Sequence, residues 1–169
     1  LPVAEMGAVE VGLVDGVHHG LSHAHARDLI HRDLKPDNIL MTQTERGDTV
    51  LKLTDFGIVH VVDPEVNNST RNMSTLYAGT PAYMSPEQLG VREGDADTRS
   101  DIYSLGVLLY TALVGQAPFT GRNDLELMRA HKYEEVPRIE GRVQAYVPDR
   151  LVELVYRMMS KDPQERPES

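Results

Sequence analysis

The sequence predicts a mainly α-helical domain with one short two-stranded ribbon, and three patterns lead to this prediction. Residues 8–26 place apolar side chains at spacings of three and four, as in an amphipathic helix. Residues 102–114 are apolar on nearly every side, which indicates a buried helix. Short apolar runs at 38–41 and 50–54 flank a polar turn, which is typical of two paired strands. The length of 169 residues suits a single compact domain.

The first predicted helix carries four histidines, His18, His19, His23 and His25. His19 and His23 have the i, i+4 spacing that two metal ligands use. Three ligands on one helix cannot easily surround an ion, even if Asp15 adds an oxygen, so we expect solvated histidines here. This helix should lead directly into the polar run that follows it.

The predicted ribbon brings two polar side chains together, because Asn38 begins its first strand and Asp55 follows its second. Residues 63–73 have no periodicity and are predicted to form a loop. From Asn123 onward, short helical patches alternate with prolines.

Composition excludes several classes of protein. The net charge of −9 argues against a general nucleic-acid or membrane-surface binder, since these need clustered basic residues. The apolar stretch 102–114 is shorter than the about 20 residues that cross a bilayer. The chain has no cysteine and no signal-peptide pattern, so we expect a cytoplasmic location, with any membrane anchor outside this chain.

The most informative motif is the run from His31 to Leu40, followed by the tripeptide Asp55-Phe56-Gly57. Two acids and an amide at these spacings suit phosphoryl transfer from a magnesium nucleotide. That reaction consists mainly of holding charged oxygens in line and neutralising them with a metal and cations.

These motifs resemble the eukaryotic-like (Hanks-type) serine/threonine protein kinases, in which H-R-D-x-K-x-x-N precedes D-F-G and an A-P-E-like tripeptide. Ser85-Pro86-Glu87 stands in the third position, and the stretch 79–88 is most similar to bacterial members. Further stretches similar to the family's C-terminal lobe are Asp101 to Gly106, Gly115 to Phe119, Asp162-Pro163 and Arg166-Pro167. The resemblance covers nearly the whole chain.

The resemblance implies a C-terminal lobe whose activation segment is about residues 55–87. No G-x-G-x-x-G occurs in the sequence, and no strand lysine or helix glutamate of the family precedes Asp33. We therefore expect residues 1–169 to be the C-lobe portion of a kinase domain, clipped at both ends, with the N-lobe as its missing partner.

The resemblance also assigns roles at the reacting centre. Asp33 would orient the substrate hydroxyl and accept its proton, and Lys35 would neutralise the transferring phosphate. Asn38 and Asp55 would hold Mg²⁺ against the phosphates of ATP. Thr80 would form hydrogen bonds to Asp33 and Lys35.

Other residues would support this centre. Leu40 would form the floor under the adenine ring, and His31 and Phe56, which precedes Gly57, would pack in a hydrophobic column that joins the lobes. Asp101 would accept hydrogen bonds from the backbone of residues 31–32, although it is also placed to be a helix N-cap.

A buried ion pair between Glu87 and Arg166 is the family's expected stabilising contact, and its loss would cost about 3 to 5 kcal/mol.

The resemblance also indicates how the site is regulated. Arg32 would bind a phosphate on the activation segment through a charge-assisted contact. The candidate acceptors are Thr75, then Ser74, then Thr70.

Three functions follow from this sequence. The first is an active serine/threonine kinase that transfers the γ-phosphoryl of ATP to Ser/Thr hydroxyls of proteins, for which the intact set of acids, amide and lysine argues. The second is a pseudokinase that acts as a scaffold. The third is a short product that docks substrates or regulates a complete kinase. We expect the isolated chain to be inactive without the N-lobe.

Overall fold

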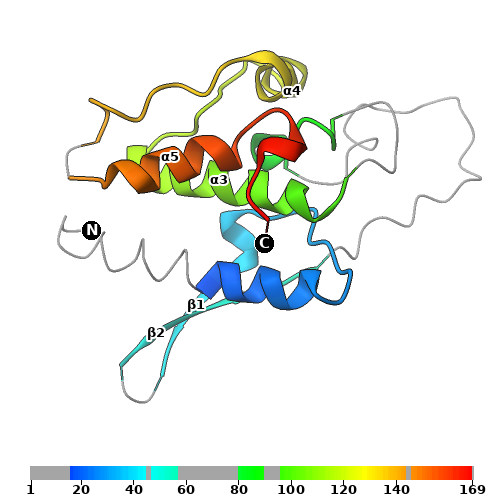
Figure 1. The fold of residues 1–169 in the computed structure, drawn as a ribbon, viewed down its shortest axis with the longest axis vertical. Helices are drawn as coiled ribbons and strands as arrows, with labels where there is room; N and C mark the ends of the chain where they lie inside the picture. The colour runs from blue at the N-terminus through cyan, green and yellow to red at the C-terminus, as the bar shows by residue number, and fades with distance from the viewer. Residues whose placement is uncertain (1–15, 45–46, 57–79, 90–95, 144–145, 169) are drawn as a thin grey trace, which may run out of the picture.

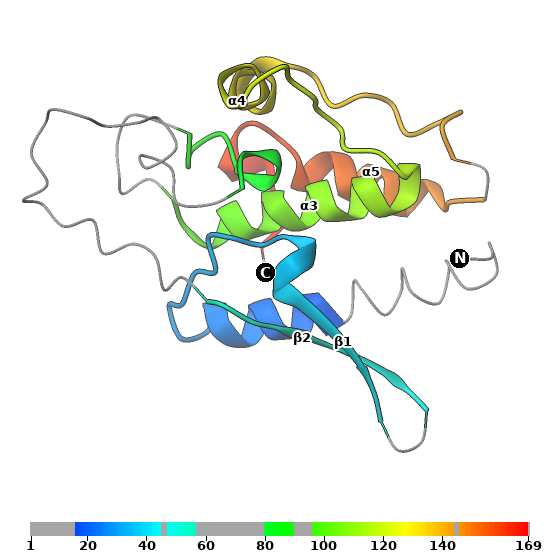
Figure 2. The ribbon, with the colours of Figure 1, turned by 180° about the vertical axis from the view of Figure 1, so that it is seen from behind.

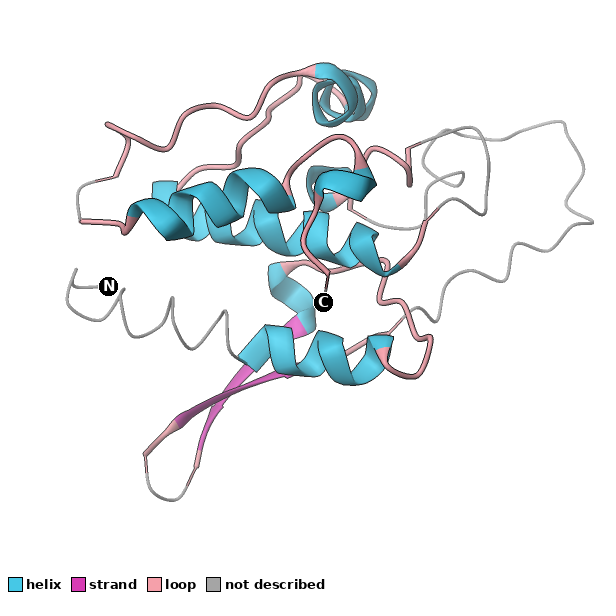
Figure 3. Ribbon diagram, viewed as in Figure 1, coloured by secondary structure: helices cyan, strands magenta, loops and turns pink. Residues whose placement is uncertain are grey.

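The computed structural model describes residues 16–44, 47–56, 80–89, 96–143 and 146–168. Its α-helices are residues 16–25, α3 (Thr98–Val114), α4 (Asp124–Tyr133) and α5 (Asp149–Met158). The short 3-10 helices are η1 (Pro36–Asn38), η2 (Pro81–Tyr83) and η3 (Pro163–Glu165), and the strands are β1 (Ile39–Gln43) and β2 (Thr49–Leu53). The predicted helix-rich fold with a two-stranded ribbon is confirmed (Figure 3).

Helix α3 is the centre of the fold. It begins after Asp97, whose side chain accepts a hydrogen bond from the backbone N–H of Arg99, and ends at Gly115, where φ is 75°. Both ends follow capping rules, because a carboxylate satisfies an unpaired N–H and glycine tolerates the left-handed conformation. Every residue from 100 to 110 is buried, which confirms most of the stretch predicted at 102–114, although residues 111, 112 and 114 are half-buried. In Figures 1 and 2, α4 lies on one side of α3, and the helix of residues 16–25 lies on the other.

Helices α3 and α5 lie side by side (Figure 1). Their close approach depends on Gly106. A Cβ atom at this position would lie 2.8 Å from Cγ of Met159 and 2.9 Å from Cβ of Met158. The absence of a side chain therefore lets the two helices pack with fully buried methionine between them.

Of the helix predicted over 8–26, residues 8–15 lie outside the described residues. The described part, residues 16–25, buries the predicted stripe, with Val17 and Leu21 fully buried. His18, His19 and His23 are exposed, as expected for solvated histidines. That expectation is wrong for His25, which is only 8 % exposed. Its position four residues after Leu21 places it on the buried face of the same helix.

The ribbon is antiparallel, with Ile39 opposite Leu53 and Gln43 opposite Thr49. One face of β2 lies on the helix of residues 16–25. Leu51 and Leu53 come so close that a Cβ on Gly16 or Gly20 would lie 3.0 or 3.1 Å from them. The observed strands differ from the predicted runs by one or two residues at their ends, because turn residues 43–44 and 47–49 extend the pairing on one side.

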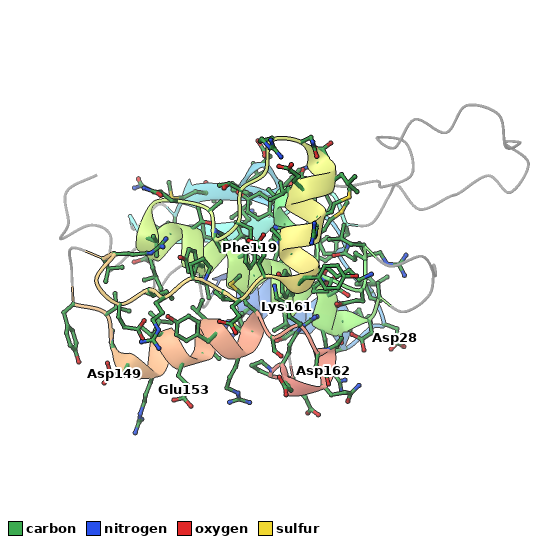
Figure 4. All side chains as sticks on the ribbon, turned by 90° about the horizontal axis from the view of Figure 1, so that it is seen from above. Asp28, Phe119, Asp149, Glu153, Lys161 and Asp162 are labelled. Carbon is green, nitrogen blue, oxygen red and sulfur yellow. The ribbon has the colours of Figure 1, made fainter. Side chains whose placement is uncertain are left out.

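A buried polar group joins α3, α4 and the chain before η3. Tyr103 Oη lies 3.1 Å from Nδ1 of His131, and Lys161 Nζ donates to the carbonyl of His131 at 2.7 Å. The ammonium of Lys161 also lies 4.3 Å from the centre of the Phe119 ring (Figure 4). Burial and the charge of Lys161 lower the pKa of His131 to about 4, so the imidazole is neutral at pH 7. Burial likewise lowers the pKa of Lys161 to about 8.

Among the described residues, no helix is both long enough and apolar enough to cross a membrane.

Candidate active site

The loop of residues 31–38, here called the 31–38 loop, is held at its start by Asp101. The carboxylate of this fully buried residue accepts hydrogen bonds from the backbone N–H groups of His31 and Arg32, both at 2.8 Å. His25 Nε2 lies 2.8 Å from the same carboxylate. The hydrogen bonds expected for Asp101 are thus present. The alternative role of Asp101 as N-cap is wrong, because Asp97 occupies that position.

The side chains of the 31–38 loop converge on Asp33. Lys35 Nζ lies 2.7 Å from Asp33 Oδ2, and Asn38 Nδ2 donates to both the carbonyl and the carboxylate of Asp33, at 2.8 and 3.2 Å. The backbone N–H of Thr80 donates to Asp33 Oδ1 at 3.3 Å. Thr80 therefore meets the carboxylate through its backbone, and Lys35 meets the same carboxylate from the loop. The structure brings these four predicted residues together.

The end of β2 is tied to the same loop. The backbone N–H of Thr54 donates to the carbonyl of Asn38 at 3.0 Å, and His31 Nε2 lies 2.9 Å from the carbonyl of Thr54. The next residue, Asp55, is exposed, and the ring of Phe56 lies 4.6 Å from that of His31. The ribbon therefore delivers Asp55 beside the loop that carries Asn38, as its two predicted strands implied.

Two of these residues have left-handed backbone, with φ of 63° at Arg32 and 59° at Asp55. This conformation costs a non-glycine residue about 1 to 3 kcal/mol and persists only where neighbouring contacts impose it. At Arg32 those contacts are visible, since its N–H binds Asp101 and its carbonyl accepts a hydrogen bond of 2.7 Å from Gln88 Nε2. Asp28, outside this region, also has a positive φ of 58°, so the contacts of Arg32 distinguish the region and the φ angle alone does not.

Glu87 and Arg166 form a buried ion pair. Arg166 donates to the two carboxylate oxygens at 2.6 and 2.8 Å, and the side chains are 0 % and 9 % exposed. Burial would raise the pKa of Glu87, but the hydrogen bonds and charge of Arg166 outweigh burial and hold it below its usual value. Ser100 Oγ adds a third hydrogen bond at 2.7 Å.

The remaining predicted residues fall into two groups. Leu40 lies on β1 and is 53 % exposed. Gly57, Thr70, Ser74 and Thr75 lie outside the described residues, as does the whole of the loop predicted at 63–73. Only the two ends of the predicted activation segment, residues 55–56 and 80–87, are described.

Comparison with known proteins agrees with this geometry. A family model described as protein kinase domain matches residues 10–169. The chain belongs to the protein kinase domain family. Proteins of this family generally use ATP and Mg²⁺ and act on protein substrates.

Several bacterial kinases are similar to this chain. It is 42 % identical over 156 residues to serine/threonine-protein kinase PknL of Mycobacterium tuberculosis, which is 92 % of this chain and 36 % of that protein. It is 38 % identical over 161 residues to serine/threonine-protein kinase pkn2 of Myxococcus xanthus, covering 93 % of this chain and 19 % of the relative. It is 38 % identical over 149 residues to DNA damage-responsive serine/threonine-protein kinase RqkA of Deinococcus radiodurans, covering 88 % and 21 %. The chain thus spans about a third or less of the length of these relatives.

Sequence reasoning missed two residues that support this candidate site. His25 touches the Asp101 carboxylate, and its spacing of four from Leu21 was the available signal. Gln88 Nε2 donates to the Arg32 carbonyl, while its Oε1 accepts from the backbone N–H of Ser85 at 3.0 Å. No local pattern marks Gln88, because its partner lies 56 positions earlier.

Proposed function

We propose that this chain is the C-terminal lobe of a serine/threonine protein kinase that transfers the γ-phosphoryl of ATP to hydroxyl groups of proteins. The observation that carries the proposal is the convergence of Lys35, Asn38 and Thr80 on the carboxylate of Asp33. The names of the similar bacterial kinases support the same activity. The glycine-rich phosphate loop and its lysine would come from the N-lobe, so the lobe alone is expected to be inactive.

The donor set fits a magnesium ion. Asn38 directs its amide N–H groups at Asp33, which leaves its carbonyl Oδ1 as a possible ligand, and Asp55 adds an exposed carboxylate nearby. Hard oxygen donors are what Mg²⁺ prefers. When bound, the ion would neutralise charge on the nucleotide phosphates. Leu40, with its exposed side chain, would support the adenine ring.

The chain's own residues would orient the acceptor. Asp33 would hold the Ser or Thr hydroxyl and take its proton as the new bond to phosphorus forms. Lys35, kept at 2.7 Å from Asp33, would place a positive charge beside the transferred group. The backbone N–H of Thr80 holds the second carboxylate oxygen, so the carboxylate cannot rotate freely.

We also propose that phosphorylation regulates the site through Arg32. A phosphate on Thr75, Ser74 or Thr70 would bind its guanidinium and order the activation segment. Arg32 is suited to this role because its backbone is fixed on both sides, by Asp101 and by Gln88. This proposal is tested by mapping the phosphorylated residues with mass spectrometry in the protein and in its Arg32→Ala variant. The cytoplasmic location stays a prediction.

The experiment that tests the activity is magnesium-dependent transfer from labelled ATP to a generic protein substrate. It compares the full-length protein, its Asp33→Asn variant, its Asp37→Asn variant and the 169-residue chain. Asp37 is the matched control, because it is an exposed acid on the same loop. Transfer by the full-length protein and by Asp37→Asn, but by neither Asp33→Asn nor the chain alone, is expected. An activated full-length protein without transfer would favour a scaffold.

A further inference from the structure

A hollow of about 500 Å³ lies between α5 and the preceding residues 139–143 and 146–147. Its apolar lining comes from Ile139, Val143, Val147 and Val152. Ile139 is fully buried and Val152 is 8 % exposed, so the floor belongs to the core, whereas Val143 and Val147 are half-buried. None of the residues assigned to the kinase site lines it. Its volume lies within the range of pockets that bind ligands.

The wall of this hollow is fixed by Tyr156. The hydroxyl of Tyr156 accepts a hydrogen bond from the backbone N–H of Ile139 at 2.7 Å and donates to Glu140 Oε2 at 2.8 Å. These bonds tie the chain at 139–140 to α5. A preformed wall lowers the entropy that a bound partner must lose.

Three carboxylates line the hollow, those of Glu140, Asp149 and Glu153, and its lining contains no Lys, Arg or His. Asp149 and Glu153 are one helical turn apart on α5 and are labelled in Figure 4. Like charges at this spacing repel each other, and a bound cation would relieve the repulsion. A hydrogen bond from its own backbone N–H and the hydrogen bond from Tyr156 lower the pKa of Glu140 below its usual value. Arg138 is a competing cation near Glu140.

We propose that this hollow binds a basic, apolar segment of a partner protein. A branched apolar side chain would enter between Val143, Val147 and Val152, and flanking Lys or Arg residues would pair with the three carboxylates. The apolar floor favours an apolar group, and the carboxylates of Glu140, Asp149 and Glu153 favour positive flanking residues over acidic ones. The exposed Arg138, Arg142 and Arg150 adjoin these acids in the chain and compete with a bound cation. This inference goes beyond the proposed function, because binding here needs no phosphoryl transfer.

The test measures binding of a fluorescein-labelled peptide by anisotropy, using the full-length protein. The peptide has a central Leu-Gly-Ile flanked on each side by two arginines. We expect Asp149→Asn/Glu153→Gln to weaken binding about tenfold. Glu135→Gln, which removes an exposed carboxylate outside the lining, should leave it unchanged. A peptide with glutamates in place of the arginines, or serines in place of Leu and Ile, should not bind.

Several outcomes would overturn the proposal. One is equal binding of the arginine peptide by the double variant and the protein itself. Another is binding of the glutamate peptide. A third is self-association, seen by sedimentation, that the double variant abolishes while the arginine peptide fails to bind, since a second copy would then be the occupant.

Urea unfolding of both variants checks that they fold. Phosphoryl transfer to a generic substrate should be unchanged in the double variant, so failure of this proposal and failure of the kinase proposal are distinguishable.

Discussion

The carboxylate of Asp101 accepts a hydrogen bond of 2.8 Å from the backbone N–H of His31, 70 positions earlier in the chain. Asp101 lies in the first turn of α3 and is fully buried. The start of the 31–38 loop is therefore positioned by the central helix of the fold rather than by its own neighbours. Damage to the anchor should affect both stability and the geometry of Asp33.

Replacing Asp101 with asparagine should lower the free energy of unfolding by about 2 to 4 kcal/mol. The amide has a single acceptor oxygen, so one of the two backbone N–H groups would face an NH₂ group and lose its partner. Asp97→Asn is the matched control on the same helix, because asparagine is as good an N-cap as aspartate. Urea unfolding measures both. Equal, small losses in the two variants would contradict the anchoring role.

Arg166→Met should destabilise the protein by about 3 to 5 kcal/mol, since it leaves Glu87 buried without its cation. Glu87→Gln alone should also be destabilising. The double variant should lose less than the sum of the two single losses, because neither charge then remains unpaired. A double-mutant cycle by urea unfolding measures this coupling, and strictly additive losses would show that the two side chains act independently.

Stability should fall as the pH is lowered from 7 to 5, in part because of His131. Burial lowers the pKa of this residue to about 4. Below its ordinary pKa of about 6.5, the unfolded chain therefore binds a proton that the folded chain does not. This difference amounts to about 2 kcal/mol at pH 5. The variant His131→Asn, compared with His18→Asn at an exposed position, should lose that part of the pH dependence. If the free energy of unfolding changed with pH equally in the two variants, His131 would not contribute to the pH dependence.

Gly106→Ala should destabilise the protein although alanine favours helices by about 1 kcal/mol over glycine. The added methyl group would lie 2.8 Å from Met159 and 2.9 Å from Met158, and overpacking of this kind costs about 1 to 3 kcal/mol. Thermal unfolding measures the change. A rise in the melting temperature would mean that α3 and α5 can separate at this contact.

Much of the fold follows from local patterns. The buried stretch of α3, the stripe of residues 16–25 and the two strands all express periodicities that short segments contain. The structure confirms each of these elements. Their ends differ from the predicted ones, because capping residues and turns determine where a helix or strand begins and ends. The expectation of solvated histidines fails for His25, because the helical period places it on the buried face, away from the exposed His18, His19 and His23.

The site was predictable where a motif carries it and not where it depends on distant chain. The 31–38 loop and Asp55 come from short runs, and the resemblance supplied Asp101, Glu87 and Arg166. Gln88 and Lys161 escaped prediction. Gln88 binds the backbone carbonyl of Arg32, and Lys161 binds that of His131, both far away in sequence. Every residue has a backbone carbonyl, so the residue type does not show which carbonyl will be bound.

The sequence separation of these anchors also determines when their contacts can form during synthesis of the chain. Ribosomes add about 5 to 20 residues per second, so Asp101 is made about 4 to 14 s after its partner His31, 70 positions earlier. The interval is longer for Glu87, because its partner Arg166 is synthesised 79 positions later. During translation the 31–38 loop can therefore gain its Asp101 anchor only once the first turn of α3 has been made, and Glu87 can be paired only once Arg166 has been made.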